Sequence, residues 1–321
     1  MKVLITNIWM IDYGGTECYV RDLAIALKSI GIEVEIYSPH IANTELSDNA
    51  DENIVSYIKS LGINIVNSVN DIKNVPDVIH GHHQVTIDVI NKFPYVPVIF
   101  FCHSIDAYSN IIIHNNIKKY VAVSHYISEM VLEPHIAKEN ISIIYNWVDT
   151  HRFIQKSKVN NIAKKALIFG NHFSSRKKDV IFNVCGQKNI ALSCIGLNNG
   201  LNIKSPEEVL QNYDIVFAIG KSAIESMACG CAVILCGFDS LMGQMIESNN
   251  FEYCRKYNFG LKNLTKEISE QELINEIEKY NSIEINKVSN MIREKSNSQK
   301  IFNEIIMLYN EVINNNNNLG C

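Results

Sequence analysis

Short apolar runs alternate along the chain with segments of helical periodicity. Val3–Ile8 is rich in β-branched residues and predicts a buried strand. Thr16 to about Ser29 then predicts a helix, which Gly31 ends, and Val34–Ser38 predicts the next strand. A strand, a glycine loop, a helix and a second strand in this order predict the start of a doubly wound parallel sheet.

The same alternation continues through the first half of the chain. A helix is expected to follow the polar loop 43–53 as far as about Leu61. Further strands are expected at Ile63–Asn67, Asp77–His82, Val98–His103, Tyr120–Ser124 and Ile141–Tyr145, with helices at Gln84–Lys92 and His125–Leu132. Because helices separate strands that are apolar on both faces, we expect a sheet that is covered on both sides.

The segment from Asn146 to about Lys164 predicts a boundary, since it turns polar and lysine-rich without a hydrophobic period. A second alternation follows, with strands at Ala166–Gly170, Ile190–Ile195, Asp214–Ile219 and Ala232–Leu235 and helices near Val180–Val184 and Pro206–Gln211. We therefore predict an α/β protein of two Rossmann-like doubly wound domains that face a cleft, residues 1–150 and 151–300. Residues 301–321 are expected to form a C-terminal helix and a disordered asparagine-rich tail, with Asn314–Asn318 frayed.

Composition narrows the class of protein. With 321 residues and 47% apolar content, the chain can bury two ordinary cores. The net charge of −5 argues against a nucleic-acid partner. Nine scattered cysteines and an N-terminus that begins a strand without a secretory signal indicate a reducing, cytoplasmic compartment. No apolar run approaches 18 residues, so we expect no membrane span, while peripheral contact with a membrane stays open.

Candidate chemistry centres on Asp214–Cys236, which predicts a strand, a tight turn at Gly220, a short helix and a second strand. A helix N-terminus at the edge of a sheet favours a phosphate. Ser222 is predicted to cap this helix and Glu225 to lie beside the phosphate. Ser222 and Glu225 also have the spacing of a capping box, so a purely structural role for Glu225 stays open.

Three more segments carry candidate residues. Gly14 and Gly15 form either a plain turn or a loop that a ligand can approach, but the chain lacks the G-x-G-x-x-G fingerprint of a nicotinamide dehydrogenase there. His80, His82 and His83 crowd a strand end, where hydrogen bonds to loops are expected more than a metal. The run of cations in GNHFSSRKK suits a diphosphate or a solvated surface.

Several of these segments resemble motifs of glycosyltransferases with the GT-B fold, family GT4. ESMACGCAVI resembles the motif E-x-M-A-x-G-x-P-V-I, in which the glutamate, here Glu225, binds the ribose of a nucleotide-sugar donor. The resemblance implies that Gly220, Lys221 and Ser222 contact the same donor. Gly14, Gly15 and Glu17 match the G-G-x-E loop, which implies that the glycines lie near the donor phosphates and Glu17 near the acceptor.

The resemblance extends to other segments. His103 matches the histidine that approaches the transferred sugar, so it is the expected catalytic residue, and Asp106 is a weaker candidate for acceptor contact. Arg176, with Lys177 or Lys178, is expected to bind the donor diphosphate. Asn146–Phe153 matches the N-G-V-D-x-x-x-F hinge, where we expect Asp149 and Phe153 to be structural, and Ser124 is expected to cap a helix.

This sequence departs from the family pattern. The family pairs its glutamate with an acidic residue eight positions earlier, where this chain has Phe217, so Lys221 is a candidate to face the donor instead. Asn171 stands where the family has arginine, Trp147 where glycine is usual and Ala232 where proline is usual.

The resemblance implies a retaining, hexosyltransferase-like enzyme of glycan or polysaccharide biosynthesis, without a bound metal or cofactor. The first domain would hold a sugar, lipid-linked or protein acceptor, and the second a nucleotide-sugar donor. Two alternatives remain open: a nucleotide-sugar epimerase on the same plan, and a non-catalytic partner that has lost the donor site. The sequence indicates no oligomeric state.

Overall fold

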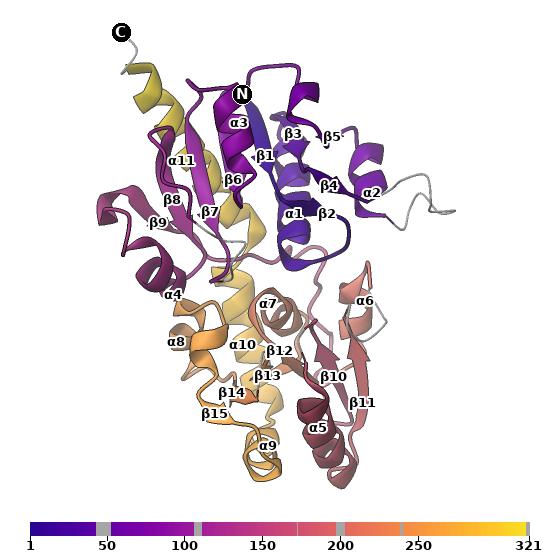
Figure 1. Cartoon of the computed structure of the whole chain (residues 1–321). Helices are drawn as coiled ribbons and strands as arrows, with labels where there is room; N and C mark the ends of the chain where they lie inside the picture. The colour runs from indigo at the N-terminus through magenta and orange to yellow at the C-terminus, as the bar shows by residue number, and fades with distance from the viewer. Residues whose placement is uncertain (43–52, 106–110, 172, 197–202, 238–239, 319–321) are drawn as a thin grey trace. The chain divides into compact units, whose positions relative to one another are not determined.

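The computed structural model describes residues 1–42, 53–105, 111–171, 173–196, 203–237 and 240–318 (Figure 1). The chain divides into two compact units. Unit 1 comprises Met1–Ile144 and Phe302–Cys321, and unit 2 comprises Tyr145–Ile301.

Unit 1 is built on a parallel sheet with the strand order β5-β3-β1-β6-β7-β8-β9. The strands are β1 Lys2–Thr6, β3 Glu33–Tyr37, β5 Asn64–Val66, β6 Val78–His82, β7 Val98–Cys102, β8 Ile117–Ala122 and β9 Ile141–Ile143. Following the chain, β3 and β5 are added on one side of β1, and β6 to β9 are then added on the other side of β1. The carboxyl ends of β1 and β6 therefore form the switch point at which such sheets bind ligands.

Helices cover both faces of this sheet. The helical segments of unit 1 are α1 Gly15–Ser29, α2 Ile54–Ser60, α3 Thr86–Lys92 and α4 His125–Ile127, with the π-helical turn η3 Ser128–Leu132 and the 3₁₀ turns η1 Val69–Asp71 and η4 Lys138–Asn140. Residues of α3 and η3 pack with Leu4, Ile79 and Phe100 in one core. Tyr19 of α1 contacts Phe101 and therefore lies on the opposite face. A small pair, β2 Trp9–Met10 and β4 His40–Ile41, flanks the sheet.

Unit 2 has the strand order β11-β10-β12-β13-β14-β15, in which the last two strands run antiparallel to their neighbours. The strands are β10 Lys165–Phe169, β11 Ala191–Ile195, β12 Ile215–Ala218, β13 Ala232–Cys236, β14 Leu241–Met245 and β15 Lys266–Glu267. The helices are α5 Ser175–Gln187, α6 Pro206–Leu210, α7 Gly220–Ala228, α8 Phe251–Lys256, α9 Glu270–Ile277 and α10 Ser282–Lys295, with the 3₁₀ turn η6 Leu261–Asn263. Two apolar cores result, one with α7 and α8 and the other with α5 and α9.

The first domain was predicted to end at residue 150, but the units divide after Ile144. The reason is that the next residues are bonded to the end of α10. The backbone N–H of Val148 donates to the carbonyl of Ser296 at 2.8 Å, and the N–H of Ser298 donates to the carbonyl of Val148 at 3.0 Å. Trp147 and Val148 are also buried.

The predicted C-terminal segment is corrected in two respects. The helix α11, Ser298–Asn318, passes into unit 1 at Phe302 instead of standing apart, and the asparagine run expected to fray is helical as far as Asn318. Tyr309 of α11 bonds through its hydroxyl to Nδ1 of His80 at 2.5 Å. A helix anchored by buried residues such as Ile305 extends at little cost, because propagation is easier than nucleation.

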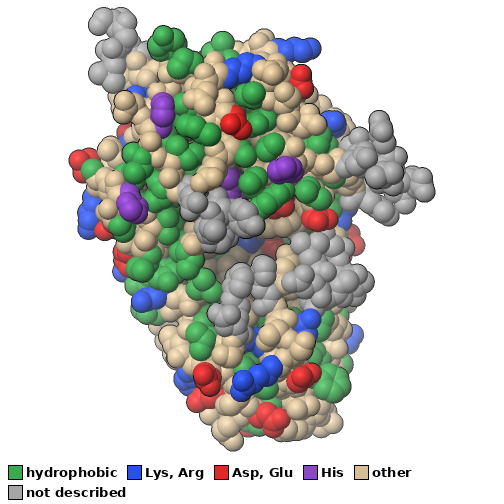
Figure 2. Space-filling model, in the orientation of Figure 1, with side chains coloured by type: hydrophobic (Ala, Val, Ile, Leu, Met, Phe, Trp, Pro, Cys, Tyr) green, Lys and Arg blue, Asp and Glu red, His purple; other side chains and the backbone are tan. Residues whose placement is uncertain are grey.

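Two general surface properties follow from the described residues. None of their helices is both long enough and apolar enough to cross a bilayer. On the face drawn in Figure 2, lysine and arginine side chains are interspersed with acidic side chains. The net charge of the whole chain is −5.

Candidate functional site

In unit 2, the segments predicted to bind the donor lie at one edge of the sheet. Strands β10 and β12 are parallel neighbours, with Ile168 paired to Phe217. Their carboxyl ends lead into Gly170 and Gly220, and then into α5 and α7. Since β11 lies on the other side of β10, this edge is the switch point of the sheet.

The start of α7 differs from the prediction. Ile219 occupies the N-cap position in an extended conformation, and no side chain caps the helix. Gly220 has a φ of +58°, a left-handed conformation that glycine adopts without strain, and its N–H donates to the carbonyl of Phe259 at 3.0 Å. The helix therefore begins three residues earlier than expected, and Ser222 is not its cap. The capping-box interpretation of Glu225 is wrong for the same reason.

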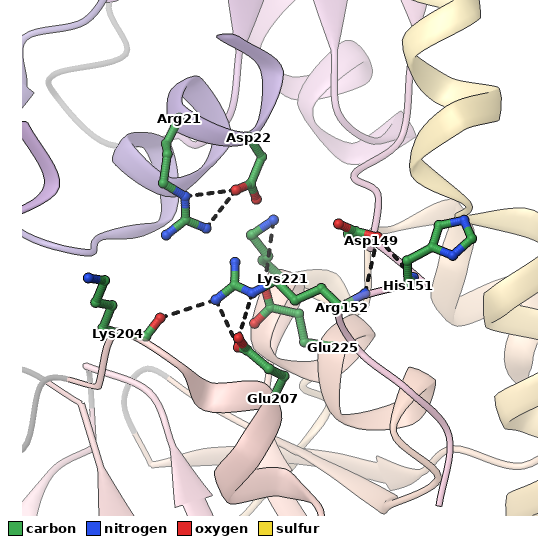
Figure 3. Close-up of polar contacts among 9 residues, drawn as sticks. All are labelled: Arg21, Asp22, Asp149, His151, Arg152, Lys204, Glu207, Lys221 and Glu225. Carbon is green, nitrogen blue, oxygen red and sulfur yellow. Dashed lines mark hydrogen bonds and ion pairs between the residues drawn. The ribbon is translucent and has the colours of Figure 1, made fainter. Parts of the chain in front are cut away.

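Glu225 forms an ion pair with Lys221 along one face of α7 (Figure 3). The Nζ atom of Lys221 lies 3.5 Å from Oε1 of Glu225 and 5.8 Å from the centre of the Trp147 ring. Only 7% of the surface of Glu225 is exposed. An ionised carboxylate and an ammonium group thus adjoin the first turn of α7, where the backbone N–H groups attract anions.

The cations of α5 separate into two groups. Arg176 is exposed and Lys178 is half-buried, in the first turn of a helix that Ser174 caps through the N–H of Lys177 at 3.3 Å. Lys177 itself is fully buried. Its ammonium group donates to the carbonyls of Gly237 and Leu241, the second at 2.8 Å. The expected diphosphate role of Lys177 is therefore contradicted by these partners, which make it a tie to the β13–β14 connection.

We expect Lys177→Met to lower the free energy of unfolding of the protein by about 1–3 kcal/mol, because two buried carbonyls lose a charged donor. Thermal or urea unfolding followed by circular dichroism measures the change. Arg176→Met, on the same turn, is the matched control. Its free energy of unfolding should stay within about 0.5 kcal/mol of the wild-type value, as is usual for exposed substitutions. Equal stability of the two variants would contradict the structural role of Lys177.

In unit 1, the paired glycines open α1. Gly14 is the N-cap, and a Cβ atom there would lie 2.5 Å from Oε2 of Glu17, so a larger residue would displace the Glu17 side chain. Burial raises the pKa of Glu17 from 4.5 to about 7, and the nearby charge of Asp12 contributes to the rise. A hydrogen bond from its own backbone N–H acts in the opposite direction. Glu17 therefore titrates close to neutral pH.

This shift predicts a pH dependence of stability. The folded chain holds the proton of Glu17 more tightly than the unfolded chain, so its contribution is complete below pH 4.5 and is lost as the pH rises to about 7. Between pH 5 and pH 8, the free energy of unfolding of the wild type should fall by on the order of 1–3 kcal/mol because of Glu17. We expect this fall to be absent in Glu17→Gln. Urea unfolding at both pH values measures it. Parallel pH curves for variant and wild type would contradict the assignment.

His103 directly follows β7 and lies against histidines of β6. Its Nε2 atom is 3.0 Å from Nδ1 of His82, and the ring of Tyr19 packs edge-on against it at 4.4 Å between centroids. His80 and His82 are fully buried, and burial holds the pKa of each well below its usual value. Among the described residues, no group of three or more histidine, cysteine or acidic side chains is placed to hold a metal ion.

Other predicted residues have structural partners or cannot be placed. Asp149 accepts hydrogen bonds from the backbone N–H groups of His151 and Arg152, and Phe153 is buried, which confirms their structural roles. Ser124 caps α4 as predicted, through the N–H of Ile127 at 3.2 Å. Asp106 lies outside the described residues.

The ion pair between Arg152 and Glu207 was not predicted from the sequence. Two nitrogens of the Arg152 guanidinium contact the two carboxylate oxygens of Glu207, each at 2.8 Å, and one also donates to the carbonyl of Lys204 (Figure 3). This bidentate pair ties the segment after Asp149 to the first turn of α6. The partners are 55 residues apart, so no local spacing signalled the contact.

Comparisons with solved structures agree with this fold. The Anabaena protein Alr3699/HepE, solved with UDP and glucose, is 13% identical, with a TM-score of 0.67 over 97% of this chain and 100% of that chain. Sucrose-phosphate synthase from Thermosynechococcus elongatus is 11% identical, with a TM-score of 0.60 over 97% of this chain and 98% of that chain. A lipopolysaccharide outer core galactosyltransferase, WaaB, is 13% identical, with a TM-score of 0.50 over 91% and 99%.

These likenesses, with two doubly wound units in one chain, define a protein of the GT-B fold, as the sequence predicted. Residues 13–152 match the family model of Glycosyltransferase Family 4. The chain therefore has the GT-B fold, and its residues 13–152 resemble Glycosyltransferase Family 4. No curated protein sequence matches it.

Proposed function

We propose that this protein is a retaining glycosyltransferase that moves a hexose from a UDP-sugar to an acceptor hydroxyl. The match to Glycosyltransferase Family 4 supports sugar transfer as the general activity. Solved neighbours contain UDP with glucose, UDP-glucose, or UDP with a 13-mer DNA, which supports a UDP-sugar donor. Retention of configuration rests on the resemblance to the GT4 motifs.

The observation that carries the proposal is the edge of the unit 2 sheet at which α7 begins. There Gly220 exposes the first turn of a helix beside the carboxylate of Glu225, at the switch point between β10 and β12. Backbone N–H groups at this turn suit the diphosphate, and the carboxylate suits the two ribose hydroxyls. Arg176 and Lys178, in the first turn of α5 at the same edge, add positive charge for the leaving diphosphate.

The chemistry is a transfer of the anomeric carbon. The bond from this carbon to the diphosphate oxygen breaks, the bond to the acceptor oxygen forms, and the proton of the acceptor hydroxyl passes to an oxygen of the leaving diphosphate. In unit 1, we assign His103 to the transferred sugar and Glu17 to the acceptor. The donor phosphates would also approach Gly14 and Gly15. No metal or cofactor is required by this scheme.

Lys221 takes the place of the acidic residue that GT4 enzymes use near the donor sugar. In this chain it pairs with Glu225, so donor binding has to reorganise one ion pair. We propose that Lys221 turns to the diphosphate when the ribose engages Glu225. Ser222 lies one residue further along the first turn of α7 and would donate to the same ligand.

We further propose that the acceptor is a sugar, lipid-linked or protein hydroxyl in glycan or polysaccharide synthesis. The likeness to the outer core galactosyltransferase supports a saccharide acceptor. A cytoplasmic enzyme, in contact with a membrane surface where the acceptor is lipid-linked, fits this proposal.

Incubation with UDP- and GDP-sugars, with and without a panel of sugar acceptors, tests the function. We expect UDP release that depends on an acceptor, and a product whose anomeric configuration by NMR equals that of the donor. An inverted product would overturn retention, and an altered free donor sugar would indicate an epimerase. Absence of any thermal shift with UDP or GDP, and of nucleotide release, would indicate a non-catalytic protein that has lost the donor site.

A further inference from the structure

The buried histidine row in unit 1 contains a residue with a role beyond packing. We propose that His82 is a positioning residue, which donates a hydrogen bond from Nδ1 to Nε2 of His103 and so fixes the proton of the neutral His103 ring on Nδ1. The effect of this hydrogen bond on catalysis rests on the proposed function, whereas the hydrogen bond itself involves only the two imidazole rings.

Strand register brings the two rings together. β6 and β7 are parallel neighbours, with His80 opposite Ile99 and His82 opposite Phe101. Side chains alternate between faces along a strand, so His103, two residues beyond Phe101, is directed to the same face as His82. The observed distance of 3.0 Å between His103 Nε2 and His82 Nδ1 is that of a hydrogen bond.

The surroundings of His82 decide which nitrogen carries the proton. Its Nε2 atom is buried and has no hydrogen-bond partner among the described residues. Its Nδ1 atom, in contrast, lies 3.0 Å from Nε2 of His103, which can accept a hydrogen bond. Because buried N–H groups without an acceptor are rare, the proton belongs on Nδ1. Nε2 of His103 must then accept.

Burial and the neighbours of the pair disfavour a positive charge on His82, and they lower its pKa. His80 and His83 contribute two further imidazoles from β6 and the turn after it, and Tyr19 of α1 covers the rings of His82 and His103. A proton on Nε2 of His103 would oppose the N–H of His82. His103 is thus held as a neutral donor through Nδ1–H, suited to a hydrogen bond with a sugar oxygen and unsuited to act as a base at that atom.

Two-bond ¹H–¹⁵N correlation spectra of the full chain labelled at histidine nitrogens test this directly. We expect His103, assigned from the signal lost in His103→Gln, to show the Nδ1–H tautomer between pH 6 and pH 8. His82→Phe should shift it toward the Nε2–H tautomer, and His82→Asn, whose amide reaches the position of Nδ1, should preserve it. His80→Asn is the matched control, because His80 is equally buried on the same strand but bonds to Tyr309.

A wild-type His103 in the Nε2–H tautomer would overturn the inference without any variant, so the test survives if His82→Phe does not fold. An unchanged tautomer in a folded His82→Phe would overturn it too. In assays of sugar transfer we expect His82→Phe to lower kcat about tenfold with the Kd for UDP unchanged, and His80→Asn to change kcat less than twofold. If the tautomers are as stated but no nucleotide binds the wild type, the proposed function fails and the positioning of His103 stands.

Discussion

Glu225→Ala is expected to weaken the binding of UDP by on the order of 10- to 100-fold. A hydrogen bond to a charged group contributes about 1.5–3 kcal/mol, and the ribose offers two hydroxyls to this carboxylate. The structure excludes the competing explanation that Glu225 caps α7, because Ile219 is the N-cap and Glu225 lies in the second turn. Calorimetric titration of folded protein with UDP measures the effect.

The matched control for this substitution is Glu284→Gln, also in unit 2. Glu284 accepts hydrogen bonds from the backbone N–H and the hydroxyl of Ser248 and pairs with Lys287, and neither partner belongs to α7. The Glu284→Gln variant should be less stable than the wild type but bind UDP with the same affinity. If Glu225→Ala binds UDP as tightly as Glu284→Gln does, Glu225 does not hold the ribose and serves only as the partner of Lys221.

His103→Ala is expected to lower kcat for sugar transfer by on the order of 10²- to 10³-fold, the range seen when one fixed donor to a developing charge is lost. The Kd for UDP should stay unchanged, because His103 is assigned to the transferred sugar, which UDP lacks. Steady-state kinetics with a responsive acceptor, together with calorimetric titration of UDP, separate the two quantities.

His135→Ala is the control, because it removes an exposed histidine of unit 1 that has no assigned role in the reaction. Its kcat should equal that of the wild type. A His103→Ala enzyme with full kcat would remove His103 from the reaction, while a variant that loses UDP binding as well would indicate a folding defect. The thermal unfolding midpoint of each variant distinguishes these cases.

Much of the fold was predictable because its periodicity is local. The expected strands of both sheets differ from the observed ones by at most three residues at either end, as the first strand, predicted at Val3–Ile8 and observed at Lys2–Thr6, shows. The antiparallel pair β14 and β15 was not predicted, because LMGQM and KE carry no clear alternation. The start of α7 was misplaced, since Ser222 has the chemistry of a cap while Gly220 has the backbone freedom that sets the turn.

Parts of the candidate site were predictable to the level of residue type only. The resemblance to GT4 motifs singled out His103, Glu225 and the cations after Gly170. It did not show that Lys177 points inward, because the carbonyls that bind its ammonium group follow it by 60 and 64 residues. Similarly, nothing local in α11 indicated that Tyr309 reaches His80, across a separation of 229 residues.

Local patterns along the chain were enough to predict the order of strands and helices, the α/β class and the set of polar residues placed at strand ends, because these depend on interactions within a few residues. The packed structure was needed to show which strand ends adjoin, which cation is buried and which nitrogen of His82 lies against His103. Those outcomes depend on register and packing between segments far apart in the chain, where many pairings satisfy the same local pattern and the packing of the whole unit selects one.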